Sequence, residues 1–143
     1  MKRQVFMILA SLSLVVMSAY AQSSGTVIVA NVPFDFIVSD KTLPAGEYTL
    51  TRPAQGITMI RSRDCKASVV FQTFTVESYK TRDELVFHRR GDKYFLSQVW
   101  TAGNSIGGEL RKCRTEKNLQ LEKISKAEGT PEFETVAVVA RQR

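Results

Sequence analysis

The chain has 143 residues, and its formal net charge at pH 7 is +6 because 20 basic residues outnumber 14 acidic ones. A length of this order fits a single domain. A mild positive excess keeps a domain soluble, and it also favours anionic polysaccharide, lipid head groups or nucleic acid as partners. Two cysteines and one histidine do not have the spacing of a metal site, so we expect no metal and no other cofactor.

Residues 1–21 have the three parts of a secretory signal peptide. Lys2 and Arg3 form the basic start, an apolar run covers 5–17, and the small residues Ala19 and Ala21 suit the signal peptidase. The apolar run is shorter than the roughly 20 residues that a membrane-spanning helix needs. We therefore expect cleavage after Ala21 and export to the periplasm or the extracellular space. The remaining part, 22–143, should form one domain without a transmembrane segment.

From residue 26 onward apolar and polar residues alternate, which is typical of half-buried strands. The first two strands are expected at 26–31 and 34–39, with the inward face carrying Phe34, Phe36 and Val38. The stretch Leu43-Pro44-Ala45-Gly46 then predicts a turn, because proline presets the backbone for a turn and glycine tolerates its closing position. A strand at 47–52 follows, and Leu43 and Tyr48 should close one end of the core.

Further strands are expected between short polar turns, at 57–62, 66–77, 84–90, 93–102 and 133–140. The run 66–77 carries apolar residues on both faces, so it should bend or contain a bulge. Gly91-Asp92 has the composition of a two-residue hairpin loop. The charged segment 110–127 predicts a surface helix, with a weak apolar stripe through Cys113, Leu121 and Ile124.

Together these patterns predict an all-β fold. About eight strands should form an antiparallel meander that closes as a barrel or a sandwich. One C-terminal surface helix precedes the last strand, and the whole of 22–143 forms a single β domain.

The sequence offers no convergent set of catalytic groups. Glu47 and His88 have no identifiable partners, and no Gly-x-Ser-x-Gly nucleophile elbow occurs, so we expect that the protein is not an enzyme. The segment 79–100 interleaves aromatic and basic residues, a mixture that binds single-stranded nucleic acid. Its aromatic residues fit inward-facing strand positions equally well, and export removes the usual partners. No nucleic acid partner is therefore expected.

A barrel of eight strands is just wide enough to enclose one small ligand. Candidate lining residues for an apolar ligand are Phe34, Phe36, Phe74, Tyr94 and Trp100. A disulfide between Cys65 and Cys113 would persist in an exported protein, and it would stabilise the fold by roughly 4 kcal/mol in the chain-entropy model. Two free thiols are the alternative, because sequence does not give the distance between the two Cα atoms.

Two stretches resemble a known group of proteins: NVPFDFIVSDKTLPAGEYTL at 31–50 and LVFHRRGDKYFLSQVW at 85–100. With the signal peptide and the charged helix after GGEL, they resemble a family of small exported bacterial β proteins of unknown function. The resemblance implies a β domain without a known activity or catalytic residue. A helix before the last strand is also similar to lipocalin-type barrels, although the Gly-x-Trp signature of their first strand is missing here.

Two functions follow as expectations. The first is a non-enzymatic exported domain with an envelope structural or interaction role, whose partner is an envelope protein or polymer. The second is a lipocalin-like β-barrel that binds a small apolar ligand.

Overall fold

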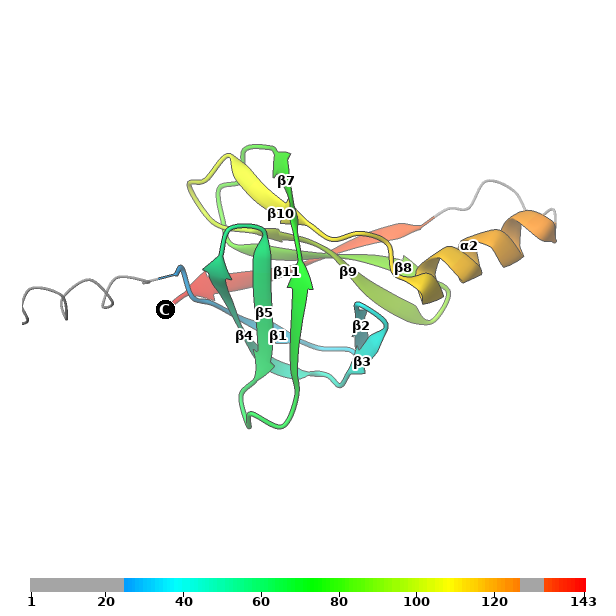
Figure 1. Cartoon of the computed structure of the whole chain (residues 1–143), viewed down its shortest axis with the longest axis horizontal. Helices are drawn as coiled ribbons and strands as arrows, with labels where there is room; N and C mark the ends of the chain where they lie inside the picture. The colour runs from blue at the N-terminus through cyan, green and yellow to red at the C-terminus, as the bar shows by residue number, and fades with distance from the viewer. Residues whose placement is uncertain (1–24, 127–132) are drawn as a thin grey trace, which may run out of the picture.

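A computed structural model describes residues 25–126 and 133–143 of the chain (Figure 1). The expected signal peptide, 1–21, and residue 127 of the expected helix lie outside the described residues. Within these two ranges the elements are β1 (Ile28–Val32), β2 (Phe36–Val38), β3 (Lys41–Leu43), β4 (Gly46–Ala54), β5 (Ile57–Ser62), β6 (Ser68–Gln72), β7 (Phe74–Glu77), β8 (Glu84–Arg90), β9 (Lys93–Trp100), β10 (Ile106–Glu109), α2 (Arg114–Ser125) and β11 (Glu134–Gln142).

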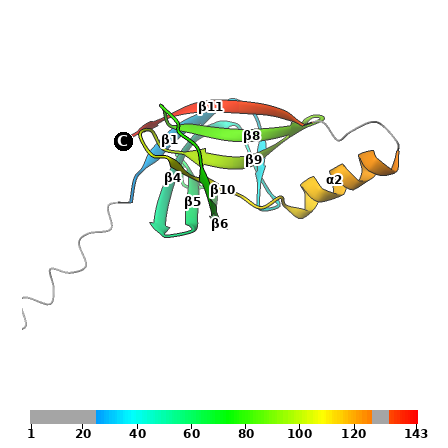
Figure 2. The same ribbon diagram turned by 90° about the horizontal axis from the view of Figure 1, so that it is seen from above.

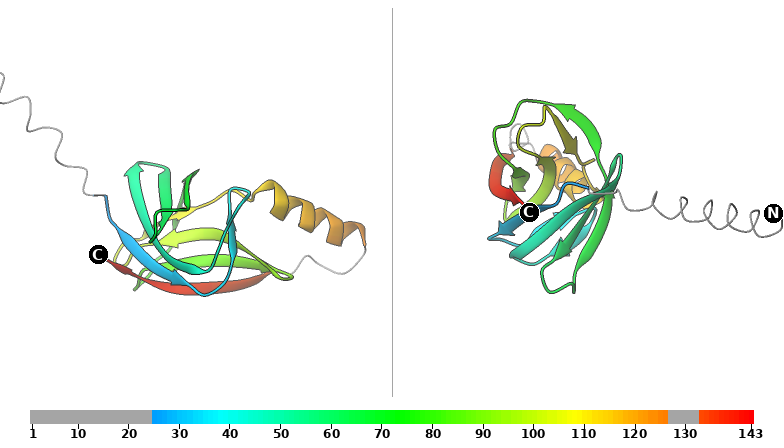
Figure 3. Two further views of the ribbon diagram at one scale, coloured as in Figure 1. Left: turned by 90° about the horizontal axis from the view of Figure 1, so that it is seen from below. Right: turned by 90° about the vertical axis from the view of Figure 1, so that its left-hand side faces the viewer.

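The strands form a nearly closed barrel. β6 and β7 are two parts of one bent strand, interrupted at Thr73, in which β6 pairs with β5 and β7 pairs with β10. Antiparallel neighbours run around the barrel in the order β1, β4, β5, β6/β7, β10, β9, β8 and β11, and β11 pairs again with β1. Figure 3 shows these strands arranged around a common centre. The predicted all-β fold, the helix before the last strand and the bend in 66–77 are confirmed, and the barrel is the form adopted.

The topology differs from the expected antiparallel meander in two ways. The short β2–β3 hairpin is an addition to the barrel wall, and β2 pairs in parallel with β9 through Ile37 and Phe95. In addition, β8 pairs with β9 and β11, whereas β7 pairs with β10. The loop before β8 is fixed near β11, because the Asp83 carboxylate accepts hydrogen bonds from Ala102 N at 2.8 Å and Gln142 Nε2 at 3.2 Å.

Aromatic side chains fill one end of the barrel interior. Phe36, Tyr48 and Phe87 are almost fully buried. The ring of Phe36 meets Tyr48 edge to face at 5.1 Å and Phe87 at 5.4 Å. Such ring pairs contribute about 0.5–1.5 kcal/mol beyond the area that they bury. Leu43 and Val38 are buried in the same core, so the predicted inward faces are confirmed.

The LPAG stretch forms a corner between β3 and β4. Ala45 N donates to the Asp35 carboxylate at 2.8 Å, and Tyr48 Oη donates to the carbonyl of Pro44 at 2.6 Å. The turn is therefore tied both to Asp35, which lies just before β2, and to the buried tyrosine that follows the turn. The stretch forms the turn that its residues predict.

Helix α2 projects beyond one end of the barrel (Figure 2). Leu121 and Ile124 are 63% and 54% exposed, so the expected apolar stripe does not pack against the strands. Among the residues of the helix, Glu116 is buried, and its carboxylate meets Arg90 Nε at 3.1 Å. The helix is thus attached by polar contacts in its first turn. No helix in the described part of the chain combines the length and the apolar character needed to cross a bilayer.

Candidate anion-binding groove

Four neighbouring strands present one row of side chains on the outside of the barrel. Arg61 of β5 lies opposite Thr49 of β4, and Thr49 lies opposite Val29 of β1. Val29 in turn lies opposite Arg141 of β11. Directly opposite residues share one face of a sheet, and the next residue along a strand points to the other face. Because Ile60 is fully buried in the core, the row that contains Arg61 faces outward.

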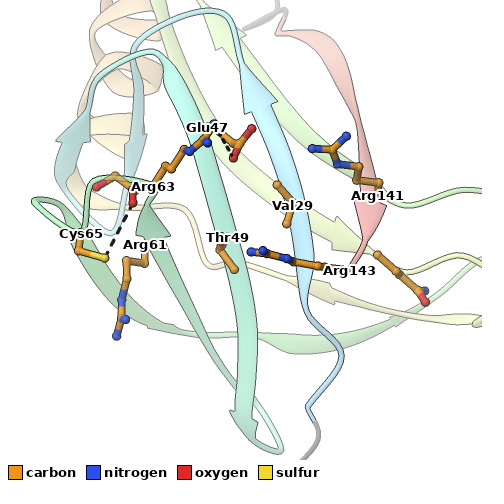
Figure 4. A pocket seen from close by; sticks show the side chains of 10 residues that line it. Val29, Glu47, Thr49, Arg61, Arg63, Cys65, Arg141 and Arg143 are labelled. Atoms are coloured by element: carbon orange, nitrogen blue, oxygen red, sulfur yellow. Dashed lines mark hydrogen bonds and ion pairs between the residues drawn. The ribbon is translucent and has the colours of Figure 1, made fainter.

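This row forms the floor and two ends of a groove with a volume of about 650 Å³ (Figure 4). Arg63 follows β5, and Arg143 follows β11 with its backbone N–H bonded to Val27 O at 3.1 Å. Figure 4 shows the Arg143 side chain extending across β1 toward β4. Four arginines therefore surround the floor, and among the described residues Glu47 is the one carboxylate side chain that lines the groove with them.

The positive charge of the groove is largely uncompensated. Glu47 pairs with Arg63 at 3.7 Å, but the Arg63 side chain is 80% exposed, and exposed pairs of this kind contribute only about 0–1 kcal/mol. Within the described residues, no carboxylate lies within 4.0 Å of the guanidinium groups of Arg61, Arg141 or Arg143. Their planar forks are free to bind carboxylate or phosphate oxygens in pairs.

The described side chains of the groove have the charge to suit an anion, whereas its hydroxyl and thiol groups make local contacts in the turn. The Ser62 hydroxyl donates to Asp64 Oδ1 at 2.6 Å and accepts from Ala67 N at 3.0 Å, so it stabilises the β5–β6 turn. The Cys65 thiol approaches the carbonyl of Arg63 at 3.9 Å. In the part of the chain that is described, no three histidine, cysteine, aspartate or glutamate side chains gather as metal ligands would.

This groove was not among the sites predicted from the sequence, although a signal was present. Arg61-Ser62-Arg63 and Arg141-Gln142-Arg143 are two Arg-x-Arg sequences at the ends of strands. In a strand, residues two apart point to the same face, so each sequence places two guanidinium groups side by side. The two sequences meet in one groove because β5, β4, β1 and β11 are neighbours in the barrel. This lateral order of strands could not be predicted from the sequence.

Three of the five expected ligand-lining residues lie together. Phe34 stacks on Tyr94 with ring centres 3.8 Å apart, and it meets Phe87 edge to face at 5.2 Å. Phe36 contacts Phe87 in turn. These rings pack directly on one another, so they form part of the core rather than the wall of an open space.

The other two expected lining residues lie elsewhere. Trp100 follows Val99, a core residue, and by strand alternation points to the opposite face of β9. There its indole N–H donates to Gln98 Oε1 at 3.0 Å, and Lys80 Nζ lies 5.6 Å from the ring centre. Phe74 is 40% exposed at the edge of the barrel. The five residues therefore do not share one surface.

The remaining candidates are His88 and the two cysteines of the expected disulfide. Both cysteines are free thiols: Cys65 is exposed in the β5–β6 turn, and Cys113 is half-buried at the start of α2. His88 Nδ1 lies 3.4 Å from Glu116 Oε1, a partner that its sequence position did not indicate.

The chain was compared with protein-family models, with curated proteins and with solved structures, and none of the three comparisons found a match. The structure itself is that of a small β-barrel with an arginine-lined outer face.

Proposed function

We propose that this protein is an exported, non-enzymatic binding domain that holds an anionic polysaccharide of the cell envelope in the arginine groove. The observation that carries the proposal is the convergence of Arg61, Arg63, Arg141 and Arg143 on one open groove. Export rests on the signal-peptide pattern at 1–21, and an envelope role agrees with the resemblance to small exported bacterial proteins.

The shape of the groove favours a polymer over a small ion. Arg61 and Arg141 stand at the ends of a row that crosses four strands, which corresponds to about 14 Å at the usual spacing of strands. A single phosphate or carboxylate reaches one end only. A chain with repeated carboxylate or phosphate groups meets both ends, with its sugar rings above Thr49 and beside the Arg143 side chain that crosses β1.

The alternative function, an apolar ligand enclosed in the barrel, has less support. It needs open space beside Phe34, Phe36 and Tyr94, whereas Phe34 and Tyr94 are in stacking contact. We therefore place the binding function on the outside of the barrel.

Isothermal titration with polygalacturonate, a carboxylated polysaccharide, tests the proposal, with uncharged dextran as the comparison ligand. We expect binding of polygalacturonate that weakens as salt is added, and no binding of dextran. Charge-assisted hydrogen bonds contribute about 1.5–3 kcal/mol each. The double variant Arg61→Gln/Arg141→Gln should therefore bind at least about tenfold more weakly.

A matched control removes two exposed arginines outside the groove, Arg82→Gln/Arg114→Gln. The control should keep the wild-type affinity although its net charge falls equally. Equal losses in both double variants would attribute binding to overall charge and overturn the proposal. Equal affinity for a single-stranded oligonucleotide would overturn the assignment to polysaccharide.

A further inference from the structure

Three apolar side chains, Ile57, Met59 and Val70, form a strip on the outer face of β5 and β6. In β5, Ile57, Met59 and Arg61 follow one another at a spacing of two residues, so their side chains point to one face of the strand. Ile60, between Met59 and Arg61, is buried in the core, so this face is the outer one. The apolar strip therefore ends at Arg61, one of the four arginines of the groove.

The neighbouring strand β6 widens the apolar strip. Val70 lies directly opposite Met59. Its neighbours in the chain, Val69 and Phe71, belong to the core, so the Val70 side chain also faces outward. Side chains that are directly opposite each other on one face of a sheet lie close enough to interact. Ile57, Met59 and Val70 therefore form one continuous apolar surface.

The apolar strip is accessible from solvent. Val70 is 60% exposed and Ile57 is 38% exposed, while Met59 is half-buried. Single exposed apolar side chains are common on protein surfaces and need no explanation. Adjoining ones on the same face are different, because a contiguous apolar surface favours contact with another molecule.

Uncharged residues border the apolar strip on both neighbouring strands. On β6, Ser68 and Gln72 stand two residues before and two residues after Val70, on the same face. On β4, Thr51 lies opposite Met59. The positive charge of this surface is therefore at the groove end of the strip.

The order of residues along β5 fixes the direction in which an amphiphile would lie. From Arg61 to Ile57 the outer face changes from charged to apolar over four residues, which is about 14 Å along a strand. Within the described residues, the Arg61 guanidinium has no carboxylate within 4.0 Å, so it favours an anionic group of a ligand. An acidic head group therefore belongs in the groove, and an aliphatic chain belongs on the apolar strip.

We propose that the groove and the apolar strip together bind an anionic glycolipid, with acidic sugars among the arginines and an aliphatic chain on Ile57, Met59 and Val70. This inference rests on the proposed function, since it uses the same groove, and it specifies that the envelope polysaccharide is linked to a lipid. A polysaccharide without a lipid would leave the apolar strip exposed to water.

Isothermal titration with octyl glucuronide, below its micelle concentration, tests the proposal. The comparison ligands are methyl glucuronide, which lacks the long chain, and octyl glucoside, which lacks the charge. We expect octyl glucuronide to bind at least about tenfold more tightly than either of them, because its chain and its carboxylate contact different parts of the site. Equal affinity for octyl glucuronide and one of the two comparison ligands would overturn the proposal.

The double variant Ile57→Thr/Val70→Thr makes the strip polar and keeps β-branched side chains, which suit strands. It should bind octyl glucuronide about as weakly as methyl glucuronide, and it should bind polygalacturonate as the wild type does. Val139→Thr is the matched control, because Val139 is 58% exposed and lies two residues from Arg141, at the opposite end of the groove. This control should keep the wild-type affinity for octyl glucuronide. Equal losses in the double variant and the control would overturn the placement of the chain.

The two kinds of ligand separate this proposal from the proposed function. Binding of polygalacturonate with no gain from the octyl chain would overturn the glycolipid and retain the polysaccharide. Binding of octyl glucuronide alone would retain the anionic glycolipid and overturn the polysaccharide, and binding of neither would overturn both. A wild-type dimer that Ile57→Thr/Val70→Thr converts to a monomer, measured by sedimentation, would assign the apolar strip to a second copy of the chain and overturn the glycolipid.

Discussion

At the scale of single residues, Glu116 is the buried carboxylate that connects the helix to the barrel. It lies 3.1 Å from Arg90 Nε and 3.4 Å from His88 Nδ1. Burial by itself would raise the pKa of Glu116, but the hydrogen bonds to His88 and Arg90 and the charge of Arg90 outweigh it and hold the pKa below its ordinary value of 4.5. The ionised carboxylate therefore stabilises the folded state above about pH 4.5, and this stabilisation is lost as the pH falls through the lower folded-state pKa.

Glu116→Gln should destabilise the protein by about 3–5 kcal/mol at pH 7, because it leaves the buried charge of Arg90 without its counterion. Urea unfolding at pH 7 and at a series of pH values below 4.5 measures the effect. The difference between wild type and variant should shrink as the pH falls, since the wild-type carboxylate then becomes neutral as well. Glu109→Gln, at an exposed position of β10, is the control and should have little effect. A loss of unfolding free energy that is the same at every pH would contradict the stabilising role of the ionised Glu116 carboxylate.

At the scale of elements, α2 receives its cap from a distant turn. Cys113 stands at the N-cap position and makes no side-chain cap bond. Asp40, between β2 and β3, instead accepts hydrogen bonds from Thr115 N at 3.0 Å and Arg114 N at 3.3 Å. The backbone hydrogen bond from Thr115 is the main cause that lowers the pKa of Asp40. A contact between positions so far apart in the chain orients the helix relative to the barrel.

Asp40→Gly should release the start of α2. Glycine suits the positive φ of 67° at this position, so the variant removes the cap without straining the turn. Loss of a cap weakens a helix by about 1 kcal/mol. Hydrogen exchange of the amides of 114 and 115 should accelerate, while exchange in β8 stays slow. Asp40→Asn keeps an acceptor oxygen and should exchange more slowly than the glycine variant. The same exchange rates in both variants would show that Asp40 does not cap the helix.

At the scale of the whole molecule, the barrel closes through the contact of β10 with β7 and β9. β10 pairs with both strands, and its glycines allow the close approach to Trp100 and Thr73. Gly107→Ala should therefore destabilise the fold by about 1–3 kcal/mol through overpacking. Gly108→Ala, where the nearest atom is 3.0 Å away instead of 2.5 Å, should have a smaller effect.

Hydrogen exchange gives the location of this effect. Amides of β7 and β10 should exchange faster in Gly107→Ala, whereas those of β8 and β11 should change little, because their pairing does not involve β10. Uniform acceleration in all strands, or a larger effect of Gly108→Ala, would contradict the importance of Gly107 for closure.

Many features of the barrel could be predicted from the sequence because strand alternation is a local property. The inward faces of Phe36 and Tyr48, the bend in 66–77 and the hairpin at Gly91-Asp92 all depend on residues close together in the chain. The lateral order of the strands depends on contacts between distant segments, so the pairing of β7 with β10 and the parallel contact of β2 with β9 were not predicted.

The candidate site was harder to predict, because it also depends on contacts between distant segments of the chain. Its two Arg-x-Arg sequences are visible in the chain, but they meet only because β11 pairs with β1. The aromatic residues chosen as ligand-lining candidates shared an alternating pattern. A bulge moves the residues beyond it to the opposite face of the strand, and the pattern does not show where a bulge lies. β8 and β9 shift register between Val86 and Phe87, and Trp100 lies beyond that shift.

Because α2 is attached to the barrel by its first turn, a small rotation at this attachment displaces the far end of the helix by a larger distance. Its 12 residues correspond to a length of about 18 Å, so a rotation of roughly 10° at the attachment moves the far end by about 3 Å. A spectroscopic label at Ile124, which points into solvent, would convert a small rearrangement around Glu116 into a displacement large enough to measure.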